Sequence, residues 1–551
     1  MKKLKIEDWL IISLLVLLPL IASKPLLREG FFSSHDGLAH LVNLAEFNLM
    51  IKAGQLPVRW AADLNFGYGN PVFNFVYPLP YYLAQVFIFL VGYLWALKII
   101  LILGFFISGI FTYLLAKEIW GKWGGLVAAT AYVFFPYRFV EIYVRGAFPE
   151  FLALSLLPLV LWAFYQLMET GRKSFFIVSS FSLAAVILAH NFIAFIFAPV
   201  LIGFLAVLLP LSDYRRAIKT GLSLILGVGL ASFFLVPVLL EGKYLASVEG
   251  AGVFKSWLHF LDLSDLWDCQ WGYRFSERGV PGTMCFQLGK INLLLGLAPL
   301  ILIGSLKKKQ RLFLTFFLLL ATGAVFMTLP ISRFLWEKIT YLAFGLFPWR
   351  FLTLSGLGLA LAGGGSVLFL REERTQKVFA VVMSALLVAF NLGFLKPQDY
   401  FPLKDENFAT QENIERFFVG RPEEKSRLYS SASVPLWVKK APQEVPEKKI
   451  ETEEETEIEE EKILPTFYSF KLKNEIESKV KINTFYFPGW KVLVDGKETK
   501  IEIDEEGTIN FSVPEGEHQV KVVFGRTEPR RIGEIGTIIS LLAVIGLSIV
   551  L

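Results

Sequence analysis

The sequence predicts a polytopic α-helical membrane protein of about twelve spans, with a small β-sandwich near its C-terminus. Of its 551 residues, 54% are hydrophobic and 52 are phenylalanine. Apolar runs of nearly 20 residues recur along the chain, and a helix of that length crosses the hydrocarbon core of a bilayer. Between residues 465 and 531, by contrast, apolar and polar residues alternate over short segments, which is the pattern of β-strands.

The first apolar run, residues 9–27, follows the basic sequence Met-Lys-Lys-Leu-Lys and lacks a convincing small-residue cleavage site. We therefore interpret it as a retained signal anchor. Further apolar runs are expected to span the membrane at about 98–116, 123–138, 152–168, 174–189, 192–210, 218–238, 291–305, 311–329, 351–370, 377–395 and 532–551.

Topology depends on residues 77–93, an apolar stretch interrupted by Pro78 and Pro80. If this stretch does not cross, the basic loops all fall on the side of the N-terminal lysines, as the positive-inside rule requires. We therefore expect a surface or re-entrant segment, both termini in the cytoplasm and a location in the plasma membrane. The net charge of +5 is then orientation charge and gives no reason to expect nucleic-acid binding. The basic loops are 117–122, 171–173, 215–219, 307–311 and 371–377.

Four parts follow from this reading. Residues 1–395 form the transmembrane domain, with external loops at 28–97 and 241–290. Residues 396–464 form a polar and acidic external linker, residues 465–531 the β-sandwich, and residues 532–551 the final transmembrane helix. Asp495-Gly496 predicts a hairpin turn inside the sandwich, which has no recognisable catalytic set and is expected to bind or to shield.

The segment around Asp36 carries the first candidate site. Apolar residues recur at helical spacing over residues 38–53, Asp36 is placed to cap that helix, and His40 lies one turn later. The pattern is that of a helix lying along a membrane surface. Asp36 acts either as a functional carboxylate or only as a helix cap.

Other ionisable residues gather in the predicted external loops, and charge at membrane depth by default suggests a site. Guanidinium groups match phosphate oxygens, so Arg145 and Arg350 are candidate phosphate ligands, whereas interfacial anchoring is the alternative. Glu150 is either a second acid or the ion-pair partner of Arg145. Cys269 and Cys285 share the loop 241–290; they pair if that loop faces an oxidising space and are otherwise free thiols.

Several motifs together resemble one family. They are His35-Asp36-Gly37, the 143–150 segment, Ala189-His190-Asn191, Trp271-Gly272-Tyr273, the 286–289 segment, Phe347-Pro348-Trp349-Arg350-Phe351 and the 486–490 segment. The chain resembles the prokaryotic membrane proteins described as 6-pyruvoyl-tetrahydropterin synthase-related, which are similar to the GT-C glycosyltransferase superfamily. The resemblance implies a GT-C-like membrane domain, a sugar donor linked to a polyprenyl phosphate, and an acidic residue in the first external loop, which Asp36 matches.

The leading hypothesis is therefore a glycosyltransferase that moves a sugar from this donor to an unknown acceptor on the outer face. A pterin-synthase activity is not expected, because the five histidines lack the spacing of a zinc site. The alternatives are a lipid or polymer transporter or flippase, and a non-catalytic envelope-binding protein. The expected catalytic residues are Asp36, Glu150 and His40; the expected substrate contacts are Arg145, Arg350, His190, His35, Trp271 and Trp349; and a tentative Mg²⁺ or Mn²⁺ would bind Asp36 and Glu150.

Overall fold

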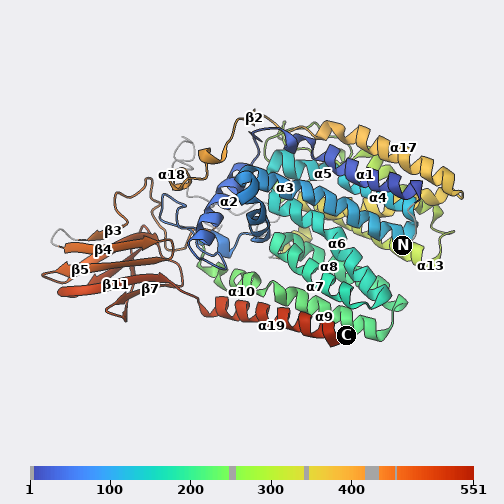
Figure 1. Ribbon diagram of the computed structural model, residues 1–551. Helices are drawn as coiled ribbons and strands as arrows, with labels where there is room; N and C mark the ends of the chain where they lie inside the picture. Colours follow the sequence, from blue (N-terminus) through green and yellow to red (C-terminus); the bar gives the residue numbers. More distant parts are fainter. Residues whose placement is uncertain (1–4, 247–255, 340–346, 416–432, 453–455, 551) are drawn as a thin grey trace.

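The computed structural model describes residues 5–246, 256–339, 347–415, 433–452 and 456–550. Parts of the predicted loop 241–290 and of the predicted linker 396–464 lie outside these ranges. Figure 1 shows a long helical part with a β-sheet region attached at one end. The helical part includes α1 (Ile6–Ala22), α2 (Gly37–Lys52), α3 (Leu79–Trp120), α4 (Lys122–Val133), α6 (Phe148–Thr170), α7 (Lys173–Ala189), α8 (Asn191–Leu208), α9 (Tyr214–Leu230), α10 (Ser232–Glu241), α12 (Lys290–Leu297), α13 (Lys308–Thr328), α16 (Leu352–Gly363), α17 (Glu373–Asn391) and α19 (Glu528–Val550).

Within the described residues, seven helices are long and apolar enough to cross a membrane. The number is eight if α9 and α10, which bend by 63°, form one broken span. The prediction of a helical membrane protein is thus confirmed, whereas the figure of about twelve spans is not. The difference arises because several apolar runs form helices that are short for a single crossing: α4 has only 12 residues, and α7 has 17.

The stretch 77–93 forms the first part of α3, and the helix breaks at Gly92, whose φ is +76°. Asp405 supplies hydrogen-bond acceptors at this break. Its two carboxylate oxygens accept the backbone N–H groups of Tyr93 (2.8 Å) and Leu94 (3.0 Å). A Cβ on residue 92 would lie 2.1 Å from Asp405 Oδ2, so glycine is required where the carboxylate approaches. Asp405 therefore caps the helix segment that follows the break.

Replacing Asp405 by alanine is expected to destabilise the protein by about 0.5–2 kcal/mol, the usual cost of losing a helix cap. Two backbone donors at the break would lose their acceptor. Thermal unfolding of the detergent-solubilised protein measures the effect. The matched control is Glu406→Ala, because Glu406 is the next residue and its side chain is 72% exposed; equal melting temperatures for both variants would contradict the capping role.

The β-sheet region contains two antiparallel sheets within the described chain. One has the strand order β3-β6-β10-β9, and the other has the order β4-β5-β11-β7-β8. The predicted turn is confirmed: Asp495 and Gly496, both with positive φ, join β7 to β8. The strands are β3 (Ile450–Thr452), β4 (Thr456–Leu464), β5 (Phe467–Asn474), β6 (Ser478–Phe485), β7 (Trp490–Val494), β8 (Lys497–Thr499), β9 (Glu502–Ile503), β10 (Thr508–Val513) and β11 (Gly516–Phe524).

The acidic run 451–461 differs from the prediction: the sequence predicts a linker, whereas the described residues of the run lie in β3 and β4. β4 lies at the edge of its sheet and keeps most of its side chains exposed. Charged residues are common on edge strands, where they discourage further pairing. A charge run thus resembles a solvated linker even when its backbone is paired. The sheet region begins at Ile450 rather than at residue 465.

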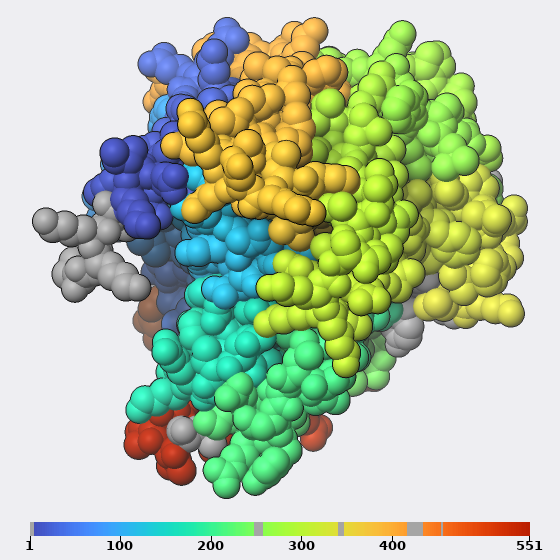
Figure 2. All heavy atoms as spheres, turned by 90° about the vertical axis from the view of Figure 1, so that its right-hand side faces the viewer, coloured from blue at the N-terminus to red at the C-terminus, as the bar shows by residue number. Residues whose placement is uncertain are grey.

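Both chain ends lie at the end of the helical part that is remote from the sheets (Figure 1). Figure 2 looks onto this end, where the blue N-terminal segment borders the orange start of α17. Lys122 pairs there with both Glu7 and Glu373, so three segments distant in sequence meet. Lys309 and Glu169 form another pair, 2.5 Å apart. Basic residues of the 117–122 and 307–311 segments thus lie at this end, and the expected orientation in the membrane stays a prediction.

The position of helix α2 also differs from the prediction. The sequence predicts a helix on the membrane surface, but most of α2 is buried inside the protein. Its polar side chains find partners on α3: Asn43 donates to the Tyr81 hydroxyl (3.4 Å) and Asn48 to Gln85 (2.6 Å). Two side chains of the polar face that was expected to face headgroups therefore bond to another helix instead.

Candidate active site

The loop that carries Asp36 is joined to the 141–150 segment by its backbone. The N–H of Asp36 donates to the carbonyl of Arg145 (2.8 Å), and the N–H of His35 donates to that of Val144 (3.1 Å). Gly146 has a φ of +66°, and a Cβ there would lie 2.6 Å from the backbone nitrogen of Gly37. Two glycines thus permit a close approach that fixes Asp36 beside Arg145.

Asp36 occupies the N-cap position of α2, as predicted, but its side chain makes no capping hydrogen bond. The residue is exposed. A carboxylate that neither caps the helix nor is buried remains available to a ligand. The structure thus lacks the side-chain hydrogen bond that the capping alternative requires, and a functional role for the Asp36 carboxylate stays a prediction.

Behind Asp36 lies a buried ion network centred on Glu150, in the first turn of α6. Glu150 Oε2 lies 2.8 Å from Nη1 of Arg145 and 3.1 Å from Nε of Arg350. Arg145 also pairs with Glu141, 2.5 Å away on the preceding π-helical turn Glu141–Arg145. His190 Nε2 is 3.9 Å from the same Glu150 oxygen. Predicted site residues from three separate loops therefore meet at one carboxylate.

The two arginines differ in access. The side chain of Arg145 is only 4% exposed and pairs with two glutamates, so it organises the network. The side chain of Arg350 is 11% exposed, which makes it the guanidinium group that a ligand reaches more readily. Glu150 pairs with both and is better suited to positioning than to proton transfer, which departs from its expected catalytic role.

The two tryptophans that were expected to contact the substrate do not present their rings to a sugar. Trp349 is fully buried, stacks on Phe347 with centroids 4.7 Å apart, and lies under the Arg145 guanidinium at 4.4 Å. It forms the wall behind the arginines, where a sugar ring does not reach it. Trp271 is half-buried and donates to the carbonyl of Lys396 (3.0 Å), so it joins two loops outside the ion network.

The histidines lie around the network rather than forming a second one. Nε2 of His35 lies 2.8 Å from the Tyr273 carbonyl, and Nδ1 of His40 lies 2.8 Å from the Tyr81 hydroxyl. His190 caps α8 by accepting the N–H of Ile193 at Nδ1 (3.2 Å), so its proton is on Nε2, toward Glu150. The ring of His190 stacks on Tyr77, with centroids 4.0 Å apart.

Burial controls protonation in this cluster. It lowers the pKa of His40 to about 4 and that of His190 to about 3, so both imidazoles are neutral at pH 7. Neutral imidazoles orient a substrate by hydrogen bonds but carry no charge for a phosphate. Burial also raises the pKa of the Glu141 carboxyl to about 7, against the opposing effect of Arg145. The network thus sets two guanidinium groups against the carboxyl groups of Glu150 and Glu141.

Sequence reasoning missed Glu141, Tyr77 and Tyr137, whose hydroxyl donates to Glu150 Oε1 (3.3 Å). Glu141 precedes Arg145 by four residues, and opposite charges at that spacing pair on one helical face. That spacing was the available signal. Tyr77 carried no comparable signal, because its contact with His190 depends on the tertiary fold.

The residues present do not fit the tentative Mg²⁺ or Mn²⁺ at Asp36 and Glu150. Glu150 faces two guanidinium groups, which repel a divalent cation. Across the described ranges, no group of three or more His, Cys, Asp or Glu residues is arranged to hold a metal.

Cys269 and Cys285 form a disulfide, with their Cα atoms 5.5 Å apart. The bridge closes the loop that carries Trp271 and Tyr273, and Tyr273 contacts His35. Of the alternatives that the sequence left open, the structure has the paired one.

The long apolar helices and the polar cluster at one end of them define a polytopic membrane protein. The chain belongs to the membrane protein family described as 6-pyruvoyl-tetrahydropterin synthase related domain, whose family model matches residues 73–395, more than half of its length.

A curated relative, an uncharacterized protein of Lactococcus lactis subsp. cremoris (strain MG1363), is 27% identical over 298 residues, which are 51% of this chain and 48% of the relative. The match thus spans about half the length of that relative. Among solved structures, arabinofuranosyltransferase AftD from Mycobacteria is similar with a TM-score of 0.46 and 14% identity over 73% of this chain and 28% of AftD. The structure of an AftD mutant is similar with a TM-score of 0.46 and 15% identity, over 73% of this chain and 29% of the mutant chain.

Proposed function

We propose that the protein is a GT-C-type glycosyltransferase of the plasma membrane. It transfers a sugar from a polyprenyl-phosphate donor to an acceptor on the extracytoplasmic face. The observation that carries the proposal is the exposed Asp36 carboxylate, held by backbone hydrogen bonds next to the arginine–glutamate network. Support also comes from the family resemblance, in which Asp36 matches the acidic residue of the first external loop.

Each part of the cluster has a role in this reaction. Asp36 accepts the proton of the acceptor hydroxyl group while the oxygen of that hydroxyl group bonds to the anomeric carbon of the donor sugar. The bond from that carbon to the phosphate oxygen breaks, and the polyprenyl phosphate leaves with the electron pair. Arg350 stabilises the charge that develops on the phosphate. Arg145 and Glu150 position Arg350, and neutral His40 lies beside Asp36 as a hydrogen-bonding group.

Replacing Arg350 by glutamine tests the phosphate role. We expect kcat/KM for a polyprenyl-phosphate sugar to fall by about 10²-fold, the usual effect of losing one charge-stabilising donor. Arg350→Lys keeps the charge but loses the fork geometry, so an intermediate loss is expected. Transfer is measured with the full chain in lipid nanodiscs and a labelled donor.

The matched control is Arg333→Gln, because Arg333 is 58% exposed and its ion-pair partner Glu337 is equally exposed. Thermal unfolding of each variant separates a binding effect from loss of fold. Wild-type kcat/KM in a folded Arg350→Gln protein would remove Arg350 from the proposed site. Absence of transfer by the wild type with every polyprenyl-phosphate sugar would remove the glycosyltransferase assignment.

A further inference from the structure

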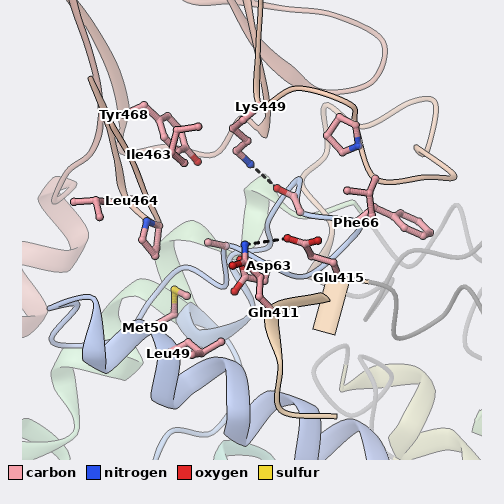
Figure 3. A pocket seen from close by; sticks show the side chains of 15 residues that line it. Leu49, Met50, Asp63, Phe66, Gln411, Glu415, Lys449, Ile463, Leu464 and Tyr468 are labelled. Atoms are coloured by element: carbon pink, nitrogen blue, oxygen red, sulfur yellow. Dashed lines mark hydrogen bonds between the residues drawn. The ribbon is translucent and has the colours of Figure 1, made fainter. Parts of the chain in front are cut away.

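A cavity of about 460 Å³ lies where the helical part meets the β-sheet region. Its walls come from the C-terminal half of α2, the loop after residue 61, the short helix α18 (Gln411–Glu415), residues 445–449 and the turn between β4 and β5. Figure 3 shows side chains from both parts pointing into it. None of the residues of the cluster described above lines the cavity.

The polar side of the cavity combines hydrogen-bond acceptors and donors. Asp63 and Glu415 supply carboxylates, Gln411 an amide and Lys449 an ammonium group. The Gln411 amide donates to Glu415 Oε1 (3.0 Å), and Lys449 donates to the Gly67 carbonyl (2.5 Å), as Figure 3 shows. Carboxylates accept hydrogen bonds from hydroxyl groups, whereas the amide and the ammonium donate to them.

The opposite walls are apolar. Leu49 and Met50 come from α2, Phe66 from the following loop, and Ile463 and Leu464 from the end of β4. Ile463 is 45% and Leu464 41% exposed, so they form an open apolar rim. A ligand that matches this lining presents hydroxyl groups on one side and carbon-bound hydrogens on the other.

The ionisable groups of the cavity carry charges of both signs. Burial raises the pKa of Asp63 to about 6, next to the buried carboxyl of Glu46, and lowers the pKa of Lys449 to about 8. Both shifts are toward the neutral forms, but each group keeps most of its charge at pH 7. Because the carboxylate repels a phosphate and the ammonium repels a polyamine, the mixed lining is better matched to an uncharged polar ligand.

We propose that this cavity binds a neutral saccharide and serves as a docking site for an acceptor glycan. The lining carries the argument: two carboxyl groups and an amide for hydroxyls, opposite an apolar wall. The role as an acceptor site rests on the proposed function. Asp36 stands before the first turn of α2 and Leu49 thirteen residues later, so the two are about 20 Å apart along the helix at 1.5 Å per residue. An oligosaccharide chain reaches from one to the other.

Binding of trisaccharides to the full chain in nanodiscs tests the proposal, measured by isothermal titration calorimetry. The probes are maltotriose, cellotriose and arabinotriose, with spermidine as a cationic comparison. We expect at least one trisaccharide to bind, and Asp63→Asn and Gln411→Ala each to weaken its affinity by about tenfold, the effect of losing a hydrogen bond to a charged or polar group. Gln411 is exposed on its helix, so its replacement leaves the fold intact even if Asp63→Asn disturbs Glu46.

Glu412→Gln is the control, because Glu412 is exposed on the same helix and does not line the cavity; its affinity should equal that of the wild type. Binding of spermidine alone, binding of none of the probes, or equal affinities in Gln411→Ala and the wild type would each overturn the proposal. The two proposals fail separately. Saccharide binding without any sugar transfer contradicts the glycosyltransferase, whereas transfer without saccharide binding here contradicts only the docking site.

Discussion

Replacing Asp36 by asparagine is expected to lower kcat for sugar transfer by about 10²–10⁴-fold, the range in which a general base contributes. Asparagine has nearly the same shape as aspartate, but its amide does not take up the acceptor proton. The local fold should persist, because the backbone N–H of residue 36 still donates to the Arg145 carbonyl and the side chain makes no capping hydrogen bond. Single-turnover transfer with a labelled polyprenyl-phosphate sugar measures the loss directly.

Glu29→Gln is the matched control for Asp36→Asn. Glu29 is an exposed carboxylate in the segment before Asp36, so the Glu29→Gln substitution removes the same charge without changing the cluster. We expect its rate to equal that of the wild type, and both variants to keep the wild-type melting temperature. A folded Asp36→Asn protein that transfers at the wild-type rate would leave the exposed carboxylate without a catalytic role.

The local sequence pattern predicts which residues belong to this site, but not which of their side chains pair with one another. The positive-inside rule placed Asp36, Arg145, His190 and Arg350 on one side, and the structure has them around a common cluster. Which oxygen pairs with which guanidinium depends on side-chain packing between loops 200 residues apart in the chain. The difference in access between Arg145 and Arg350 has the same origin.

Burial explains the predictions that were wrong. The periodicity of a sequence shows which face of a helix is apolar, but it does not show what covers the polar residues. The pattern of α2 is that of a surface helix, whereas in the structure Asn43 and Asn48 bond to α3. Trp349 was expected to contact the substrate, whereas it is buried and packs beneath Arg145. In both cases the local pattern was read correctly and its environment was not.

Replacing Glu241 by alanine is expected to destabilise the protein by about 3–5 kcal/mol, the cost of leaving a buried charge without its partner. Glu241, at the end of α10, is 1% exposed. Its Oε2 accepts from Arg530 through Nη2 (3.0 Å) and Nε (3.1 Å), and from the Asn74 amide (2.5 Å). Arg530, at the start of α19, also donates to the carbonyl of Pro488 (2.9 Å) in the β-sheet region. One carboxylate therefore holds the first turn of the last helix and the sheets against the helical part.

The loss of stability in Glu241→Ala should exceed the loss on breaking an exposed ion pair, so an exposed pair of the same chain serves as the control. Arg333 and Glu337 lie 2.6 Å apart but are 58% and 60% exposed, so Glu337→Ala should cost at most about 1 kcal/mol. Chemical unfolding in detergent compares the two. Glu241→Leu combined with Arg530→Met should recover part of the loss, because it removes both charges and fills the space with apolar atoms. If Glu241→Ala were as stable as Glu337→Ala, the buried ion pair would not hold the sheets in place. The cavity between the helical part and the sheets would then lack the fixed geometry that saccharide binding requires.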